Sequence, residues 1–93
     1  FAGLIPQVID KVSEIELAFR IFPAYWGKGL VYEACQPIID YAFKTLKLPR
    51  LISIIDPQNF RSQKLSTRLG FHVEKKANYN GFITDIYVLT SSQ

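Results

Sequence analysis

The chain has 93 residues, of which 48% are hydrophobic and 20% charged, and it carries a net charge of +3. A chain of this length and composition forms one compact domain with a modest core, and it is too apolar to be disordered. The charges are scattered along the sequence. Nucleic acid is therefore a weak candidate partner, and a phosphate-bearing small ligand is equally compatible with the charge.

Cysteine and histidine are scarce. The only cysteine, Cys35, cannot form an internal disulfide, and with His72 as the only histidine there is no metal-ligand spacing. No apolar run approaches the roughly 18 residues that a membrane span needs, and the start does not resemble a signal peptide. We therefore expect a cytoplasmic protein with no metal site and no membrane segment.

The apolar pattern changes along the chain between a period of two and one of about 3.6, and it predicts the element order β-β-α-β-α-β-β. A short strand is expected over residues 1–6, followed by a polar turn over residues 8–13. The clearest strand spans residues 14–22, with Ile15, Leu17 and Phe19 on one face and Glu14 and Glu16 on the other.

The remaining elements follow in order. Residues 28–47 show the spacing of an amphipathic helix, which Pro37 is expected to break or kink. A strand is predicted over residues 51–55, a helix over 59–69 ended by Gly70, and a hairpin of residues 71–79 and 82–90 turned at Asn80-Gly81. The sequence thus predicts an α/β (α+β) fold in which a mixed sheet packs with two helices in one domain, residues 1–93.

The stretch FPAYWGKGLVYEA, residues 22–34, places Gly27 and Gly29 around Lys28, between a strand and a helix. The first N–H groups of a helix lack partners, and glycine lets an anion approach them, so the turn is suited to phosphate. The alternative is that the glycines only supply positive φ in the turn. The stretch is neither a Walker loop nor a dinucleotide fingerprint, because the required further glycines are absent.

A second stretch, IIDPQNFRSQKLSTRLGF (residues 54–71), follows in the same chain. Together with FRIFPAYWGKGLVYEA it resembles the GNAT N-acetyltransferase superfamily, and within it the RimJ/RimL type, which acetylates the N-terminal alanines of ribosomal proteins. The resemblance runs from about Glu14 to the C-terminus. It implies a mostly antiparallel GNAT-like sheet and acetyl-CoA as cosubstrate. The acceptor that it implies is a primary amine, and a protein N-terminus is one such acceptor.

The resemblance also implies binding residues. It places the pantetheine arm of acetyl-CoA on the backbone of Ile21 and near Asn59 and Ser62. It places the pyrophosphate on the backbone amides of the glycine turn. The residues so assigned are Ile21, Gly27, Lys28, Gly29, Leu30, Val31, Asn59, Ser62 and Lys64. Capping of the helix is an equal alternative for Asn59, and a solvated face is the alternative for Lys64. Val31 and Tyr32 replace smaller residues of the family pattern and are expected to add bulk beside the pyrophosphate.

Acetyl transfer needs a base for the amine and a proton for the departing thiolate. Glu16, on the polar face of its strand, is the candidate base, directly or through water, and a simple surface carboxylate is the alternative. Glu14 is expected to be solvated. Ser66 stands where many superfamily members have a tyrosine acid, and a serine hydroxyl is a poorer acid than a phenol.

Complete family members carry an N-terminal strand and two helices that have no counterpart in this sequence. Three readings follow: a truncated acetyltransferase that binds acetyl-CoA, a degenerate non-catalytic GNAT-like interaction module, and a basic nucleic-acid binder. An uncovered sheet edge near residues 1–6 predicts a homo-oligomer. The alternative is that another segment of the same protein covers that edge. The sequence does not identify the amine acceptor.

Overall fold

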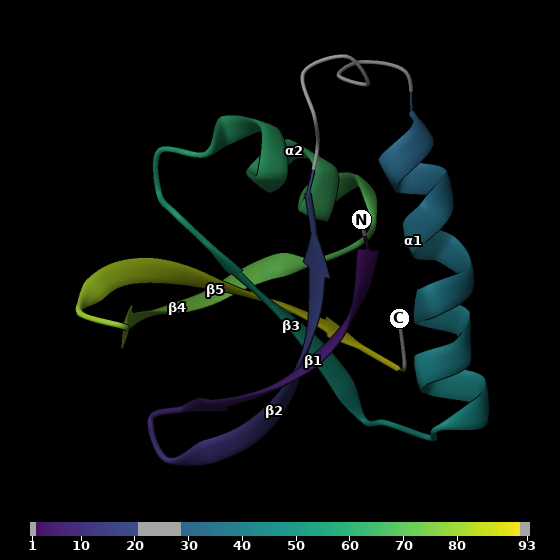
Figure 1. Cartoon of the computed structure of the whole chain (residues 1–93), viewed down its shortest axis with the longest axis horizontal. Helices are drawn as coiled ribbons and strands as arrows, with labels where there is room; N and C mark the ends of the chain where they lie inside the picture. The colour runs from purple at the N-terminus through teal and green to yellow at the C-terminus, as the bar shows by residue number, and fades with distance from the viewer. Residues whose placement is uncertain (1, 21–28, 92–93) are drawn as a thin grey trace.

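The computed structural model describes residues 2–20 and 29–91. Within these ranges the chain forms a five-stranded sheet in the order β1-β2-β3-β5-β4, with α1 and α2 packed beside it (Figure 1). β2 and β3 are parallel, and the other neighbouring strands are antiparallel. The predicted element order and the mixed, mostly antiparallel sheet are confirmed. The elements are β1 (Ala2–Ile9), β2 (Val12–Phe19), α1 (Leu30–Asp40), η2 (Tyr41–Thr45), β3 (Arg50–Ile55), α2 (Phe60–Arg68), β4 (His72–Tyr79) and β5 (Phe82–Thr90).

The first hairpin differs from the prediction. The expected turn over residues 8–13 is wrong, because β1 continues to Ile9 and β2 begins at Val12. Only Asp10 and Lys11 form the turn, with φ of 49° and 68°. Two successive positive φ values are typical of the tight turn whose twist matches that of antiparallel strands. β1 therefore extends past the predicted end at residue 6 by Gln7, Val8 and Ile9.

The helix after the glycine turn begins at Leu30, two residues later than predicted, and Gly29 is its N-cap. It runs through Pro37 without ending there, and a wide π-helical turn, η2, follows at Tyr41–Thr45. The amide of Leu46 donates to the carbonyl of Tyr41 at 3.0 Å, which closes this turn. The predicted end at residue 47 thus lies just past the helical region.

The C-terminal half agrees with the prediction to within two residues. Asn59 caps α2, and Gly70, with φ of 99°, follows its end. β4 and β5 form the expected hairpin, and Asn80 and Gly81 take φ of 52° and 85° at its turn. Local turn and cap chemistry was enough to predict these elements.

The sheet buries apolar side chains on both faces. One cluster joins the helices to the sheet and includes Leu17, Leu51 and Leu89 together with Cys35 of α1 and Leu65 of α2. Cys35 is fully buried in this cluster, and burial raises the pKa of its thiol.

A second cluster lies on the opposite face and consists of Ile9, Ile52, Ala77, Ile86 and Val88. The two edge strands approach one another across this face. Lys75 of β4 binds Asp10 of the first turn at 2.9 Å, and the hydroxyl of Tyr79 donates to Oε1 of Gln7 at 3.2 Å. The sheet is therefore curled, and its curl encloses the second cluster.

Candidate functional site

The most irregular part of the sheet is the parallel pair β2–β3. The two strands share a single bridge, Glu16 with Ile52, although β2 continues to Phe19 and β3 to Ile55. Figure 1 shows the two strands running at a wide angle to each other. A regular parallel ladder has evenly spaced bonds along its whole length, so the strands separate after this bridge.

Side chains bond to main-chain groups at the point of separation. The hydroxyl of Ser53 on β3 donates to the carbonyl of Leu17 on β2 at 2.9 Å. In the other direction, the amide of Ile54 on β3 donates to Oε2 of Glu16 on β2 at 3.0 Å. Ser53 is 1% exposed and Glu16 9% exposed, so both are buried polar groups with partners.

Glu16 has a second anchor on β1. Its Oε1 accepts a hydrogen bond of 3.0 Å from Nε2 of Gln7, and Gln7 in turn accepts the hydrogen bond from Tyr79. The sequence placed Glu16 on the polar face of its strand, with a surface carboxylate as the alternative to a base. The curl of the sheet instead buries this carboxylate, and the alternative of a simple surface carboxylate is wrong.

A cleft of about 140 Å³ opens between the separated strands. Its walls are residues 16–19 of β2 and 53–55 of β3, followed by Asp56, Asn59 and Ser62 at the start of α2. Three residues assigned from the sequence, Glu16, Asn59 and Ser62, thus line one cavity. A buried carboxylate lies on its wall, and the start of a helix closes its other side.

The helix cap at Asn59 is confirmed, since its Oδ1 accepts a hydrogen bond of 3.2 Å from the amide of Ser62. Lys64 lies outside the cleft on an exposed part of α2, beside a shallow hollow formed with Gln58, Asn59, Phe60 and Arg61. The cap does not remove Asn59 from the cleft, because the same residue lines it.

Ser66 is the second residue predicted to be catalytic. Its side chain is fully buried, and its Oγ has no hydrogen-bond partner among residues 2–20 and 29–91. Ser66 is not among the residues that line the cleft. A buried hydroxyl without a partner is uncommon and costs stability.

The glycine turn is described only from Gly29 onward, so Ile21, Gly27 and Lys28 lie outside the described residues. Gly29 has φ of 70°, and a Cβ at this position would meet no atom of residues 2–20 and 29–91 within 4 Å. Its neighbours Leu30 and Val31 begin α1. Val31 and Tyr32 pack against the helix-side core cluster, and the guanidinium carbon of Arg68 lies 4.3 Å from the centre of the Tyr32 ring.

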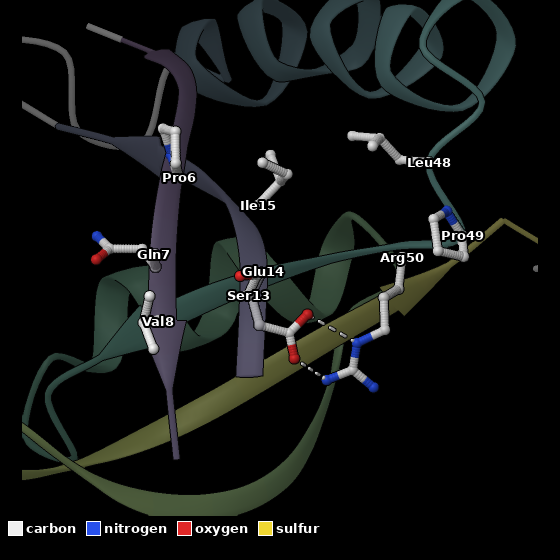
Figure 2. Close-up of a pocket in the computed structure, with 9 residues that line it drawn as sticks. All are labelled: Pro6, Gln7, Val8, Ser13, Glu14, Ile15, Leu48, Pro49 and Arg50. Atoms are coloured by element: carbon white, nitrogen blue, oxygen red, sulfur yellow. Dashed lines mark hydrogen bonds and ion pairs between the residues drawn. The ribbon is translucent and has the colours of Figure 1, made fainter. Parts of the chain in front are cut away.

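A separate groove of about 520 Å³ lies between the first hairpin and the segment that leads into β3 (Figure 2). Figure 2 shows the carboxylate of Glu14 paired with the guanidinium of Arg50 at one side of it. The expectation that Glu14 is solvated is wrong, because its side chain is only 11% exposed. The residues lining the groove are Pro6, Gln7, Val8, Ser13, Glu14, Ile15, Leu48, Pro49 and Arg50.

Gln7, Ser53 and Tyr79 belong to the site but were not predicted from the sequence. Gln7 was missed because the first strand was ended too early, and the alternation Ile5, Gln7, Ile9 was the available signal. Ser53 stands as a lone hydroxyl within the apolar run of β3, where a buried polar group demands a partner. No local signal connects Tyr79 to Gln7, because they lie 72 positions apart.

Two further features concern the described residues alone. Residues 2–20 and 29–91 contain no helix that is long and apolar enough to cross a membrane. The same ranges hold no cluster of three or more histidine, cysteine, aspartate or glutamate residues suited to a metal ion.

Comparison with known proteins gives the family. Residues 2–72 match the model of the acetyltransferase (GNAT) domain. The spermidine N(1)-acetyltransferase of Escherichia coli is 36% identical over 88 residues, which cover 92% of this chain and 47% of that protein. An acetyltransferase structure from Agrobacterium tumefaciens has a TM-score of 0.80 at 28% identity, covering 95% of this chain and 50% of that one.

The ribosomal-protein-S5-alanine acetyltransferase of Vibrio fischeri has a TM-score of 0.74 at 26% identity, with 84% of this chain and 46% of that one covered. The chain spans about half the length of the relatives that it matches. The matched residues include the separated strands and the start of α2, and the fold agrees in both structures. The chain therefore belongs to the GNAT acetyltransferase family.

Proposed function

We propose that the chain binds acetyl-CoA in the cleft between β2 and β3 and supports transfer of the acetyl group to a primary amine. The observation that carries the proposal is the opened parallel pair, whose cleft runs from the buried Glu16 to Asn59 and Ser62. Strands that separate after one bridge leave a hollow lined by main chain, which an extended arm can enter as an added strand does. Membership in an acetyltransferase family supports acetyl-CoA as the occupant.

In this reaction the amine nitrogen attacks the thioester carbonyl carbon, the new C–N bond forms and the C–S bond breaks. The nitrogen loses a proton and the departing thiolate gains one. Glu16 is the proposed base, because it lies on the cleft wall and each of its oxygens is held by an N–H donor. Each carboxylate oxygen keeps a second lone pair, which can accept the proton.

The pyrophosphate is proposed to bind the turn before α1 through Gly27, Lys28, Gly29, Leu30 and Val31, and the pantetheine arm to bind Ile21, Asn59 and Ser62. Three features support this assignment: the positive φ of Gly29, the absence of any atom of the described residues within 4 Å of a Cβ there, and the packing of Val31 and Tyr32 against the core. Packing of Val31 and Tyr32 against the core supports the proposal that their side chains leave room for the phosphates. Lys64, exposed on α2, is a proposed phosphate contact.

Isothermal titration with CoA tests the binding site, using Gly29→Ala and Gly81→Ala as a matched pair. Both glycines have positive φ, and neither Cβ would meet an atom within 4 Å in the part of the chain that the structure describes. Each substitution should therefore lower the free energy of unfolding by about 1 kcal/mol. Only Gly29→Ala should weaken CoA binding. No CoA binding by the parent chain at millimolar concentration would refute the proposal and favour the non-catalytic interaction module.

The acceptor is proposed to be the amine of a protein N-terminus, as in the RimJ/RimL type. The named relatives act on two kinds of amine, a polyamine and a ribosomal-protein alanine. Thiol release from acetyl-CoA, measured with an alanine-terminated peptide and separately with spermidine, distinguishes them. A faster reaction with spermidine would contradict the proposal.

We also propose that the protein is cytoplasmic and that it forms a homo-oligomer through the outer edge of β1.

A further inference from the structure

We propose that Glu16 and Ser53 are positioning residues that hold β2 and β3 apart, by bonding the main-chain groups that would otherwise form the next rung of the parallel ladder. The inference rests on the proposed function, because it assigns the cause of the cleft in which acetyl-CoA is proposed to bind. It concerns the two side chains that cross the gap in opposite directions, one from each strand.

The geometry of the ladder identifies the rung. The bridge joins Glu16 to Ile52, and parallel pairing repeats every two residues along each strand. The bond that follows in register runs from the amide of Ile54 to the carbonyl of Leu17. Both groups are bonded instead to a side chain of the opposite strand: the Ile54 amide to Glu16 Oε2, and the Leu17 carbonyl to the Ser53 hydroxyl.

We call the hydrogen bonds from Ile54 to Glu16 and from Ser53 to Leu17 the two caps of the separated strands, and the cost of unpaired main-chain groups explains why they are needed. A main-chain group at the mouth of a buried cleft costs free energy if it has no partner, so strands tend to continue pairing. Two side-chain bonds satisfy the Ile54 amide and the Leu17 carbonyl without drawing the backbones together. The strands can then separate after one bridge while the polar groups at the point of separation stay paired.

Gln7 and Tyr79 make the Glu16 cap rigid. Gln7 on β1 holds the second carboxylate oxygen of Glu16, and Tyr79 on β4 holds Gln7. The cap is therefore fixed from the two edges of the curled sheet. Glu16 has two separable roles, as a spacer through its hydrogen bonds and as a base through its charge.

The substitutions Glu16→Leu and Ser53→Ala each delete one cap. Glu16→Gln is the conservative variant, because its amide oxygen still accepts from Ile54 and its amide nitrogen can donate to a flipped Gln7. Thr84→Val is the matched control. Its buried hydroxyl also donates to a main-chain carbonyl of the next strand, that of Ala77 at 3.1 Å, but it lies outside the cleft.

NMR on the 93-residue chain tests the proposal without any ligand. The through-hydrogen-bond coupling between the Ile54 nitrogen and the Leu17 carbonyl carbon should be absent in the parent, Glu16→Gln and Thr84→Val. It should appear in the Glu16→Leu, Ser53→Ala double variant, as the strands pair by one more rung. A coupling in the parent, or none in a folded double variant, overturns the proposal.

Titration with CoA is the second readout. Ser53→Ala and Glu16→Leu should each weaken binding by about tenfold or more, which is about 1.4 kcal/mol, whereas Glu16→Gln and Thr84→Val should bind as the parent does. Equal losses in Ser53→Ala and Thr84→Val would show a general structural effect and refute the positioning role. If the parent does not bind CoA, the proposed function fails, and the NMR result still decides whether the two caps hold the strands apart.

Discussion

Arg50 binds Glu14 through two hydrogen bonds, from Nη2 to Oε2 at 2.8 Å and from Nε to Oε1 at 3.1 Å, although the residues lie 36 positions apart. The same guanidinium donates from Nη1 to Glu74 at 2.9 Å. Glu74 is the extra residue of the bulge between Val73 and Lys75 in β4. One side chain of β3 therefore links β2 to β4, with β5 between β3 and β4 in the sheet.

Arg50→Met should lower the free energy of unfolding by about 2 kcal/mol, because the carboxylate of Glu14, which is largely buried, would lose both hydrogen bonds from the guanidinium. The matched control is Lys44→Met, which removes an exposed pair of 3.9 Å with Asp40. Such a pair contributes about 0.5 kcal/mol or less. Urea unfolding of the two variants measures the difference, and equal effects would show that the Arg50 cluster contributes no more than a surface pair.

The same cluster predicts a loss of stability in acid. Hydrogen bonding from Arg50 holds the pKa of Glu74 below its ordinary value of 4.5. A carboxylate with a depressed pKa in the folded state stabilises the fold at pH values above its unfolded pKa, and this contribution is lost as pH falls through the folded pKa.

Unfolding free energies measured between about pH 6 and pH 3 should therefore fall more steeply in the parent than in Glu74→Gln, below about pH 4.5. Glu74→Gln keeps a side chain of similar size and removes the titrating group. Parallel pH curves for the two proteins would show that this carboxylate does not contribute to acid unfolding.

The sequence predicts an element of this fold well where neighbouring residues in the chain specify it. Asn80-Gly81 and the Asn59 cap are local, and both were found where predicted. The first turn was missed because Asp10 and Lys11 adopt positive φ without a glycine. Extended apolar residues on both sides of it were then assigned to a turn.

The site shows the same division. Of the residues that line the cleft, Asn59 and Ser62 were assigned from the family resemblance, and Glu16 from its place on the polar face of its strand. The burial of Glu16 was not predicted, because it follows from the curl that brings β4 to β1. That curl depends on contacts between residues far apart in the chain, such as Lys75 with Asp10, which no periodicity encodes.

Substitution of Ser66 distinguishes an effect on the free energy of unfolding from an effect on acetyl transfer. Its buried hydroxyl has no partner among the described residues, so Ser66→Ala should raise the free energy of unfolding by about 1 kcal/mol. Thr67→Ala is the control for helix propensity, because that exposed hydroxyl on the same helix is already bonded to the carbonyl of Gln63.

If Ser66 also supplies the proton to the thiolate, Ser66→Ala should slow acetyl transfer while CoA binding stays unchanged. Unaltered transfer together with the gain in stability would show that Ser66 does not serve as the acid. A loss of stability larger than that of Thr67→Ala would mean that the hydroxyl has a partner in the folded protein.

The outer edge of β1 leads to the last prediction. Within the described residues β1 pairs only with β2, and Val8 on it is 66% exposed beside the groove of Figure 2. An unpaired strand edge recruits other strands, and two copies related by a twofold axis can satisfy each other in this way. We therefore expect a homodimer in which the two β1 strands pair.

The substitution Val8→Lys should weaken this homodimer, because a charge on an edge strand opposes pairing. Phe82→Lys is the control, since that side chain is 73% exposed but lies at the tip of the other hairpin. Light scattering on the three proteins tests this, and a monomeric parent at high micromolar concentration would refute the dimer.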